Sequence, residues 1–386
     1  MTFLMVATVA VLFGAGAFAE EEDGHVVLYG SGGGGYWSGS IWAEAKGGTK
    51  KGWQDDAVGV LYEGNINRPQ NAVDLRVYKI RWESSGSFMF SGAGRLLLGA
   101  GGLELVANMN FNSTVGNGIH LTDSQTWRSS SDSARTVNIF GATAYLTEGG
   151  VPVFSAADDV ELTLGSKLTW AMQGQIAFDN ADIMVGSSGK LAISNLAKSD
   201  TRAKIRTLTV DGSTTSTIVL PSGEERLQIG TLKLRNGGQL SVSHSTASLG
   251  YAADEIAGKI VADAGAGTLA GKLSGGTAAV EIEVAEGAKL TLAPTWTGDP
   301  TEVALTGVGT VVFGGSGVAP VITSVEGFTG TIEMAGPCAF ADGILESLQG
   351  KVVVSANATV QVDYPKSLDA SKFEIASGKT LTVRYV

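Results

Sequence analysis

A short phrase recurs along most of this chain, and it constrains the fold more than any other feature of the sequence. Each copy has a glycine, one or two polar residues, and then an apolar residue that opens a strand-like run. Self-similarity of this kind is the signature of a repeat architecture. The phrase occurs as GRLLLG (94–99), GSKLTW (165–170), GKLAIS (189–194), GQLSVS (238–243), GTLAG (267–271), GAKLTLA (287–293), GTVVFGG (309–315), GTIEMAG (330–336), GKVVVS (350–355) and GKTLTVRYV (378–386).

The copies follow one another at a nearly constant spacing in the C-terminal part. Leu290 to Val311 and Val311 to Ile332 are each 21 residues apart, and Ile332 to Val352 is 20. A longer gap of 49 residues, between positions 191 and 240, fits a skipped phrase or an inserted loop. A unit of about 21 residues is long enough for one coil of a solenoid.

Within a unit, side chains alternate with a period of two. In VANMNFN (106–112), Met109 and Phe111 share one face, whereas Asn108 and Asn110 lie on the other. A strand with a single apolar face must stack on its neighbours to bury that face, and glycine can supply the positive-φ corners between strands. The sequence therefore predicts an all-β chain folded as a right-handed parallel β-helix.

An antiparallel β-sandwich is the alternative fold, because its short strands alternate in the same way. Two-residue hairpin signals are scarce, however: Asn-Gly occurs only at Asn117 and Asn236. Only segments 252–266 and 341–349 have helical patterns, and both are short. The parallel solenoid is the better prediction.

The N-terminus has the features of a secretory signal. Residues 1–19, MTFLMVATVAVLFGAGAFA, are apolar and end in A-x-A before four acidic residues, so we expect cleavage after Ala19. A membrane anchor is the alternative. The predicted organisation is a signal peptide (1–19), an aromatic N-terminal cap (20–64) and β-helix repeats (65–386). The expected location is secreted, outer-membrane-associated or at the cell surface, with membrane contact only through the signal or a separate anchor.

Charge and glycine content exclude some ligands. The formal net charge of −11 argues against nucleic acid, because few cations are present to neutralise phosphates. Residues 30–35, GSGGGG, formally match a dinucleotide-binding loop, but YWSGSIW follows them where such a loop would open a helix. We therefore expect no nucleotide and no other cofactor. Cys338 is the only cysteine, so no internal disulfide can form.

Residues 91–142 resemble the autotransporter-associated β-strand repeat proteins. The coils LTGVGTVVFGG (305–315) and EGFTGTIEMAG (326–336) are similar to coils of the same passenger domains. The resemblance implies a bacterial passenger-like β-helix whose N-terminal cap opens with paired tryptophans. The positions that match the repeat pattern in 91–142 are Leu96, Leu98, Gly101, Gly102, Ile119, Leu121, Gln125, Thr126, Trp127, Val137, Ile139 and Gly141.

Two groups of residues are candidates for a site. Trp37, Trp42 and Trp53 could stack on glycans, since aromatic faces bind sugars, although packing inside the cap is the simpler role. Asp158 and Asp159 could serve a polysaccharide-cleaving enzyme. Neighbours on a strand point to opposite faces, so we expect these two acids in a turn instead.

Other chemically suggestive residues have structural explanations. His120 lies between two apolar residues and is expected on the outer side of a strand. Trp127 and Trp170 are expected in the core. Segment 199–210 (SDTRAKIRTLTV) is expected to be a charged outer strand, and a face that binds acidic sugars is the alternative. The chain has no H-E-x-x-H or C-x-x-C motif, so no metal ligands are predicted.

The expected function is therefore non-enzymatic. We expect a structural or adhesive β-helix protein whose partners are surface glycans or other cell-surface components. No catalytic, cofactor-binding or metal-binding residue is assigned. The alternative is a polysaccharide lyase or glycoside hydrolase on the same scaffold, with acidic and basic side chains converging in one groove.

Overall fold

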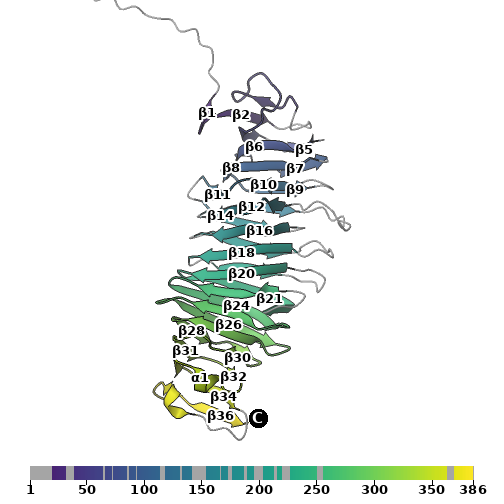
Figure 1. Ribbon diagram of the computed structural model, residues 1–386. Helices are drawn as coiled ribbons and strands as arrows, with labels where there is room; N and C mark the ends of the chain where they lie inside the picture. The colour runs from purple at the N-terminus through teal and green to yellow at the C-terminus, as the bar shows by residue number, and fades with distance from the viewer. Residues whose placement is uncertain are drawn as a thin grey trace, which may run out of the picture.

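The computed structural model shows a rod-shaped parallel β-solenoid, with β1 and β2 at one end and the C-terminus at the other (Figure 1). The structure describes residues 20–385 except 32–38, 64–65, 72, 85–86, 93, 114–117, 131–132, 141–153, 166, 173–175, 187–188, 195–202, 213–214, 220–226, 250–254 and 363–368. The predicted signal peptide (1–19) and Trp37 lie outside the described residues.

Two large sheets run along the rod, and the chain alternates between them. The first sheet has 18 strands. Its strands are β1 (Glu21–Glu22), β2 (His25–Ser31), β3 (Trp42–Ala43), β4 (Ala57–Glu63), β6 (Leu75–Trp82), β8 (Leu96–Leu105), β10 (Ile119–Leu121), β11 (Gln125–Ser129), β13 (Phe154–Ala156), β14 (Glu161–Leu164), β16 (Ile176–Val185), β18 (Ala203–Asp211), β20 (Leu227–Arg235), β23 (Lys259–Ala262), β25 (Val280–Val284), β27 (Glu302–Gly307), β30 (Val321–Ser324) and β32 (Ala339–Phe340).

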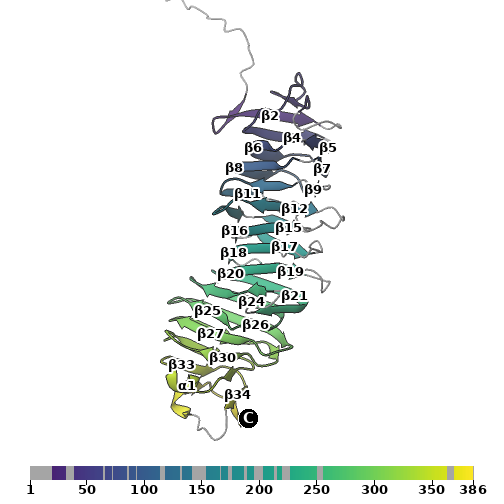
Figure 2. The ribbon, with the colours of Figure 1, turned by 45° about the vertical axis from the view of Figure 1, so that its right-hand side comes forward.

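The second sheet has 16 strands, and successive coils of it are visible as β15, β17, β19 and β21 in Figure 2. All but β22 and β29 lie on one path. The strands are β5 (Ile66–Asn71), β7 (Ser87–Gly92), β9 (Met109–Ser113), β12 (Arg135–Phe140), β15 (Leu168–Met172), β17 (Lys190–Ser194), β19 (Thr215–Val219), β21 (Gly238–Leu249), β22 (Glu255–Ala257), β24 (Ala266–Gly275), β26 (Lys289–Thr297), β28 (Thr310–Phe313), β29 (Ser316–Gly317), β31 (Thr331–Met334), β33 (Lys351–Val354) and β35 (Phe373–Ile375). A small third sheet pairs β34 (Ala358–Val362) with β36 (Leu381–Tyr385).

The register confirms the spacing read from the sequence. Leu290 pairs with Val311, Val311 with Ile332, and Ile332 with Val352, all in parallel. The 49-residue gap holds the extra strand β19, whose Thr215–Val219 stacks between β17 and β21. The skipped phrase is therefore a coil that lacks the glycine signature.

The phrase glycines act chiefly by close approach, which corrects the expected positive-φ role. A Cβ on Gly350 would lie 2.0 Å from the carbonyl oxygen of Gly330, and a Cβ on Gly330 would lie 2.0 Å from that of Gly309. None of these three has positive φ, whereas Gly287 and Gly378 do, at 74° and 73°. Glycine recurs because each coil lies directly on the backbone of the coil before it.

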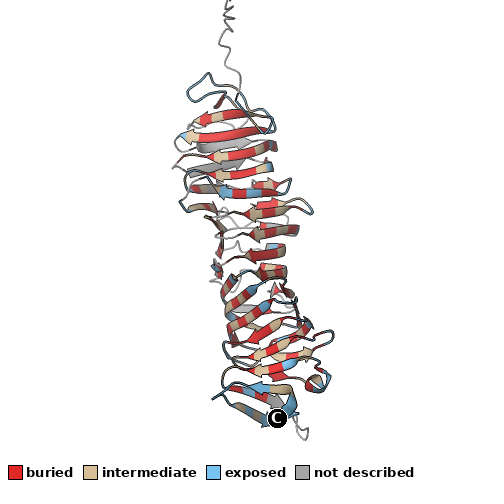
Figure 3. Ribbon diagram, turned by 90° about the vertical axis from the view of Figure 1, so that its left-hand side faces the viewer, coloured by how far each residue is buried: buried red, intermediate tan, exposed pale blue. Residues whose placement is uncertain are grey.

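A continuous apolar core fills the solenoid, as the buried residues of each coil show in Figure 3. One inward row of the second sheet runs through Trp170, Leu191, Ser216, Leu240 and Leu269, all of them buried. Ser216 accepts a hydrogen bond from the Leu191 backbone N–H at 3.2 Å, which satisfies the buried polar group.

A cluster of aromatic side chains packs within this core. Trp127 and Trp170 are both buried, as predicted, and their ring centroids are 5.2 Å apart. Phe154 and Phe178 complete the cluster. The indole N–H of Trp127 donates to the Gln125 side chain at 2.9 Å, whereas that of Trp170 has no acceptor among the described residues.

The parallel ladder begins inside the segment predicted as a cap. β2 pairs in parallel with β4, and β4 with β6, so β2 and β4 already contribute coils. β1 and β3 pair with β2 in the antiparallel direction and cover it. These two short strands lie at that end of the sheet, within the segment predicted as the cap.

One of the two expected helices is wrong. The described part of 252–266 forms β22, β23 and the start of β24, because its apolar residues continue the ladders of both sheets. The other is confirmed in short form as α1 (Ile344–Ser347). A 3₁₀ turn, η1 (Ala370–Lys372), precedes β35.

Candidate functional site

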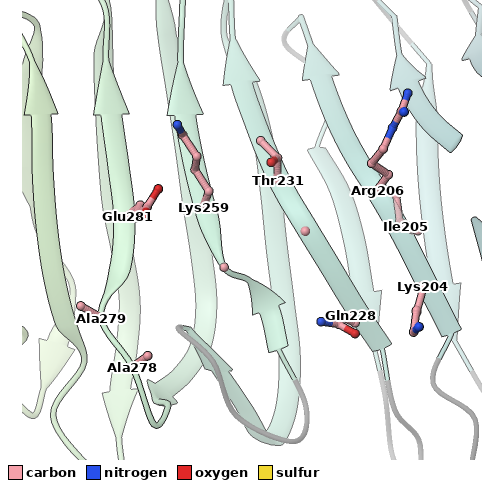
Figure 4. A pocket seen from close by; sticks show the side chains of 11 residues that line it. Lys204, Ile205, Arg206, Gln228, Thr231, Lys259, Ala278, Ala279 and Glu281 are labelled. Carbon is pink, nitrogen blue, oxygen red and sulfur yellow. The ribbon is translucent and has the colours of Figure 1, made fainter. Parts of the chain in front are cut away.

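A hollow of about 700 Å³ lies on the outer face of the first sheet, over β18, β20, β23 and β25; we call it the central groove (Figure 4). Small residues and one isoleucine line its floor, and longer polar side chains form its rim. The floor residues are Ile205, Gly230, Gly258, Ala278 and Ala279. The rim residues are Lys204, Arg206, Gln228, Thr231, Lys259 and Glu281.

Strand register places the rim. Thr231 pairs with Lys259, and Lys259 with Glu281, so these three project outward from successive coils, as Figure 4 shows. Their inward neighbours, such as Ile260 and Ile282, are buried in the core. A Cβ on Gly230 would lie 2.9 Å from the Arg206 carbonyl oxygen, so no larger side chain fits at this point without a shift and the groove stays unfilled there.

Arg206 is held by two carboxylates, Asp182 from the preceding coil and Asp159 from the coil before that. Its Nε and Nη2 each lie 2.9 Å from an oxygen of Asp182, and its Nη1 lies 2.6 Å from Asp159. These hydrogen bonds raise the pKa of Arg206 further. Partial burial alone would raise the pKa of Asp182, but hydrogen bonds from Arg206 and Thr207 outweigh it and lower that pKa. The guanidinium is therefore a fixed cation at the rim.

Lys259 is also kept protonated. Its Nζ lies 2.8 Å from Glu283, and this hydrogen bond raises the pKa of the lysine, with a smaller contribution from Glu281. A lysine that acts as a general base needs a lowered pKa. Lys259 is therefore suited to binding rather than to proton abstraction.

A second hollow of about 610 Å³, the N-terminal groove, lies on the same face over β6, β8, β11 and β14. Lys79, only 4% exposed, forms its base and binds Glu22 and, at 2.7 Å, Glu104. Partial burial would raise the pKa of Glu104, but hydrogen bonds from Lys79 and Arg128 lower it. The rest of the lining is Asp23, Tyr78, Ala100, Gly101, Ser124, Gln125, Thr126, Glu161 and Thr163.

The acidic pair proposed from the sequence does not form a two-carboxylate site. Asp158 and Asp159 lie in the turn before β14, where Asp159 has φ of 60°. Asp158 accepts a hydrogen bond from the Asn180 amide at 2.8 Å, whereas Asp159 pairs with Arg206. The structure thus connects Asp159 to the central groove through a cation.

The aromatic platform proposed from the sequence is mostly interior. Trp42 is fully buried, and its ring centroid lies 4.7 Å from that of Trp53. Trp53 is partly buried and donates its indole N–H to the Arg76 carbonyl at 3.0 Å. Burial of Trp42 fits the packing role and leaves neither face of its ring open to a sugar.

His120 is half-buried on the outer side of β10 and lies 2.8 Å from the Ser155 hydroxyl, as expected of a surface residue. Burial, and then Arg95, lower its pKa. Sequence reasoning missed the rim of the central groove, whose members come from coils about 25 residues apart. The only signal in the sequence is the basic segment 199–210, which contributes Lys204 and Arg206 to the groove.

Neither a metal-binding cluster nor a membrane-spanning helix occurs among the described residues. The described residues contain no cluster of three or more His, Cys, Asp or Glu side chains that could hold a metal ion. No helix in the described part of the chain is long and apolar enough to span a membrane. No protein family, curated protein or solved structure matches this chain.

Proposed function

We propose that this chain is an exported β-solenoid with a structural or adhesive role at the cell surface or outside the cell. It would bind surface glycans or other cell-surface components through the outer face of its first sheet. The signal-like residues 1–19 and the resemblance to autotransporter-associated repeat proteins support export. The solenoid fold is compatible with such a passenger domain.

The central groove is the observation that carries the binding role. It brings hydroxyl, amide, ammonium, guanidinium and carboxylate groups from successive coils to one open hollow. Arg206 and Lys259 are fixed by ion pairs, so little rotamer freedom remains to be lost when a ligand binds. A preorganised polar rim of this kind suits a hydroxylated ligand better than an apolar one.

The test is binding of the purified protein to immobilised glycans and to isolated cell-surface material. Ala278→Trp fills the central groove from an exposed floor position, and Ala376→Trp is a matched control at an exposed position near β35. We expect the first variant to bind at least tenfold more weakly and the second to bind like the parent. Equal binding by all three proteins would contradict the proposed role of the groove.

A second candidate function is polysaccharide cleavage, because Arg206, Lys259 and Glu281 all line one groove. The raised pKa of Lys259 weighs against a lysine base there. Incubation with acidic polysaccharides, followed by detection of unsaturated products or new reducing ends, separates the two functions. Turnover that Glu281→Gln abolishes would replace the binding proposal with the enzymatic one.

A further inference from the structure

The two grooves lie on the same face of the same sheet, and a single outward row of residues connects them. Each member pairs with the next in the parallel ladder, from β14 of the N-terminal groove to β25 of the central groove. The row is polar at every position. It consists of Glu161, Asp182, Thr207, Thr231, Lys259 and Glu281.

The row runs along the rod, at right angles to the strands. Glu161 and Lys259 are four ladder steps apart, which corresponds to about 19 Å at the usual strand spacing. From β8 to β25 the ladder has seven steps, or about 34 Å. A ligand that fills both grooves must therefore be an extended chain.

The cations Arg206, Lys259 and Lys79 on this face are each paired with carboxylates, and the carboxylates outnumber them. Arg206 is matched by Asp159 and Asp182, Lys259 by Glu283, and Lys79 by Glu22 and Glu104. A face with more carboxylates than cations does not favour a polyanion. It offers many hydrogen-bond donors and acceptors at regular intervals, which is what a chain of hydroxyl groups requires.

Backbone pairing weighs against an extended peptide. A peptide that joins a sheet needs a free strand edge. The strands that carry the row, β14, β16, β18, β20, β23 and β25, each pair with a strand on both sides.

We infer that the two grooves and the row between them form one track for a linear, neutral or weakly charged polysaccharide that lies along the rod axis. The inference rests on the proposed binding function and names its ligand class. Hydroxyl groups would bond the outward polar row, and the apolar faces of the sugar rings would lie on the small floor residues.

The test is a length series of neutral linear glucans, xylans and mannans, from disaccharides to chains longer than about 34 Å, the seven-step span of the track. A matched acidic polygalacturonate series tests the polyanion alternative. Binding is measured by calorimetry with the parent protein and four variants. Ala100→Trp and Ala278→Trp fill one groove each from exposed positions, Thr207→Trp raises a barrier between the grooves, and Thr207→Val removes the same hydroxyl without a barrier.

We expect affinity for at least one neutral series to rise steeply with chain length until both grooves are covered. Thr207→Trp should remove most of that gain, which is on the order of 10²-fold for two linked contacts, and leave short chains unaffected. Thr207→Val removes one hydroxyl of the row, which also bonds Asp182, without adding bulk, so it should weaken long-chain binding only a few-fold and keep most of the gain with chain length. Thermal melting of each variant checks that the solenoid is intact.

Three results would overturn the track: affinity that does not depend on length, no effect of Thr207→Trp on long chains, or binding of the acidic series alone. Binding to cell-surface material that depends on Ala278 but not on Thr207 would remove the track and leave the proposed function standing. If neither glycans nor surface material bound, the proposed function would fail together with the track.

Discussion

The two buried tryptophans of the core allow a matched test of what a single hydrogen bond contributes. Trp127 and Trp170 are both fully buried and touch each other, yet only Trp127 has an acceptor for its indole N–H. Changing each to Phe removes the same atoms from the same cluster. The packing loss is therefore similar in the two variants and largely cancels when they are compared.

The hydrogen-bonding terms have opposite signs. Trp127→Phe leaves the Gln125 side-chain oxygen buried without its donor, which costs about 1–3 kcal/mol. Trp170→Phe removes a buried N–H that has no acceptor among the described residues, so a desolvation penalty of about 1–3 kcal/mol disappears. We expect Trp127→Phe to be the less stable variant by at least about 2 kcal/mol, the sum of the two lower limits.

Urea unfolding followed by far-ultraviolet circular dichroism measures this difference, because tryptophan fluorescence would change in both variants. Since solenoid coils can unfold in stages, the comparison should use the midpoint of the transition that includes the aromatic cluster. Equal midpoints, or a lower midpoint for Trp170→Phe, would refute the reasoning from hydrogen bonding.

Three further predictions concern the ladder and its charges. Ser216→Ala should lower the free energy of unfolding by about 1–3 kcal/mol, because the Leu191 N–H is left without its acceptor. The outward control Thr217→Ala should change it by less than about 0.5 kcal/mol, and urea titration of both variants measures the difference. Gly330→Ala should destabilise by about 1–3 kcal/mol, since its Cβ would meet the Gly309 carbonyl; a wild-type thermal midpoint would contradict the close approach. The pKa of Glu104 is lowered in the folded state, so the stability it contributes is present above its ordinary pKa of 4.5 and is lost as pH falls through the folded value; Glu104→Gln should flatten that part of the stability–pH curve.

The recurring phrase was sufficient to predict the solenoid, because coil spacing follows from residues that are local in sequence. The pairs Val311–Ile332 and Ile332–Val352 show this directly. The strand β19 does not match the phrase because five polar residues, not one or two, separate Gly212 from the first apolar residue, Ile218; it is recognisable only by its place between β17 and β21. Segment 252–266 was misassigned because its alternation is short and its alanines suit either structure.

The candidate site was much harder to predict than the fold. Thr231, Lys259 and Glu281 are ordinary outward residues in their own coils, and only the register brings them to one groove. Loops of unequal length separate these coils, so spacing in the sequence does not reveal the alignment. The tryptophans are more conspicuous in the sequence than these rim residues, but Trp42 is fully buried by packing at the end of the rod.

The direction of the backbone ladder has a mechanical consequence. The strands lie across the rod, so their hydrogen bonds point along it (Figure 1). Under tension between the two ends, the strand pairs are loaded in series. We therefore expect the coils to unfold one after another instead of all together. Each coil of 21 residues, such as the one from Val311 to Ile332, would release about 70 Å of chain. A protein tethered at one end and attached at the other would thus extend in steps under load and dissipate mechanical energy at each step.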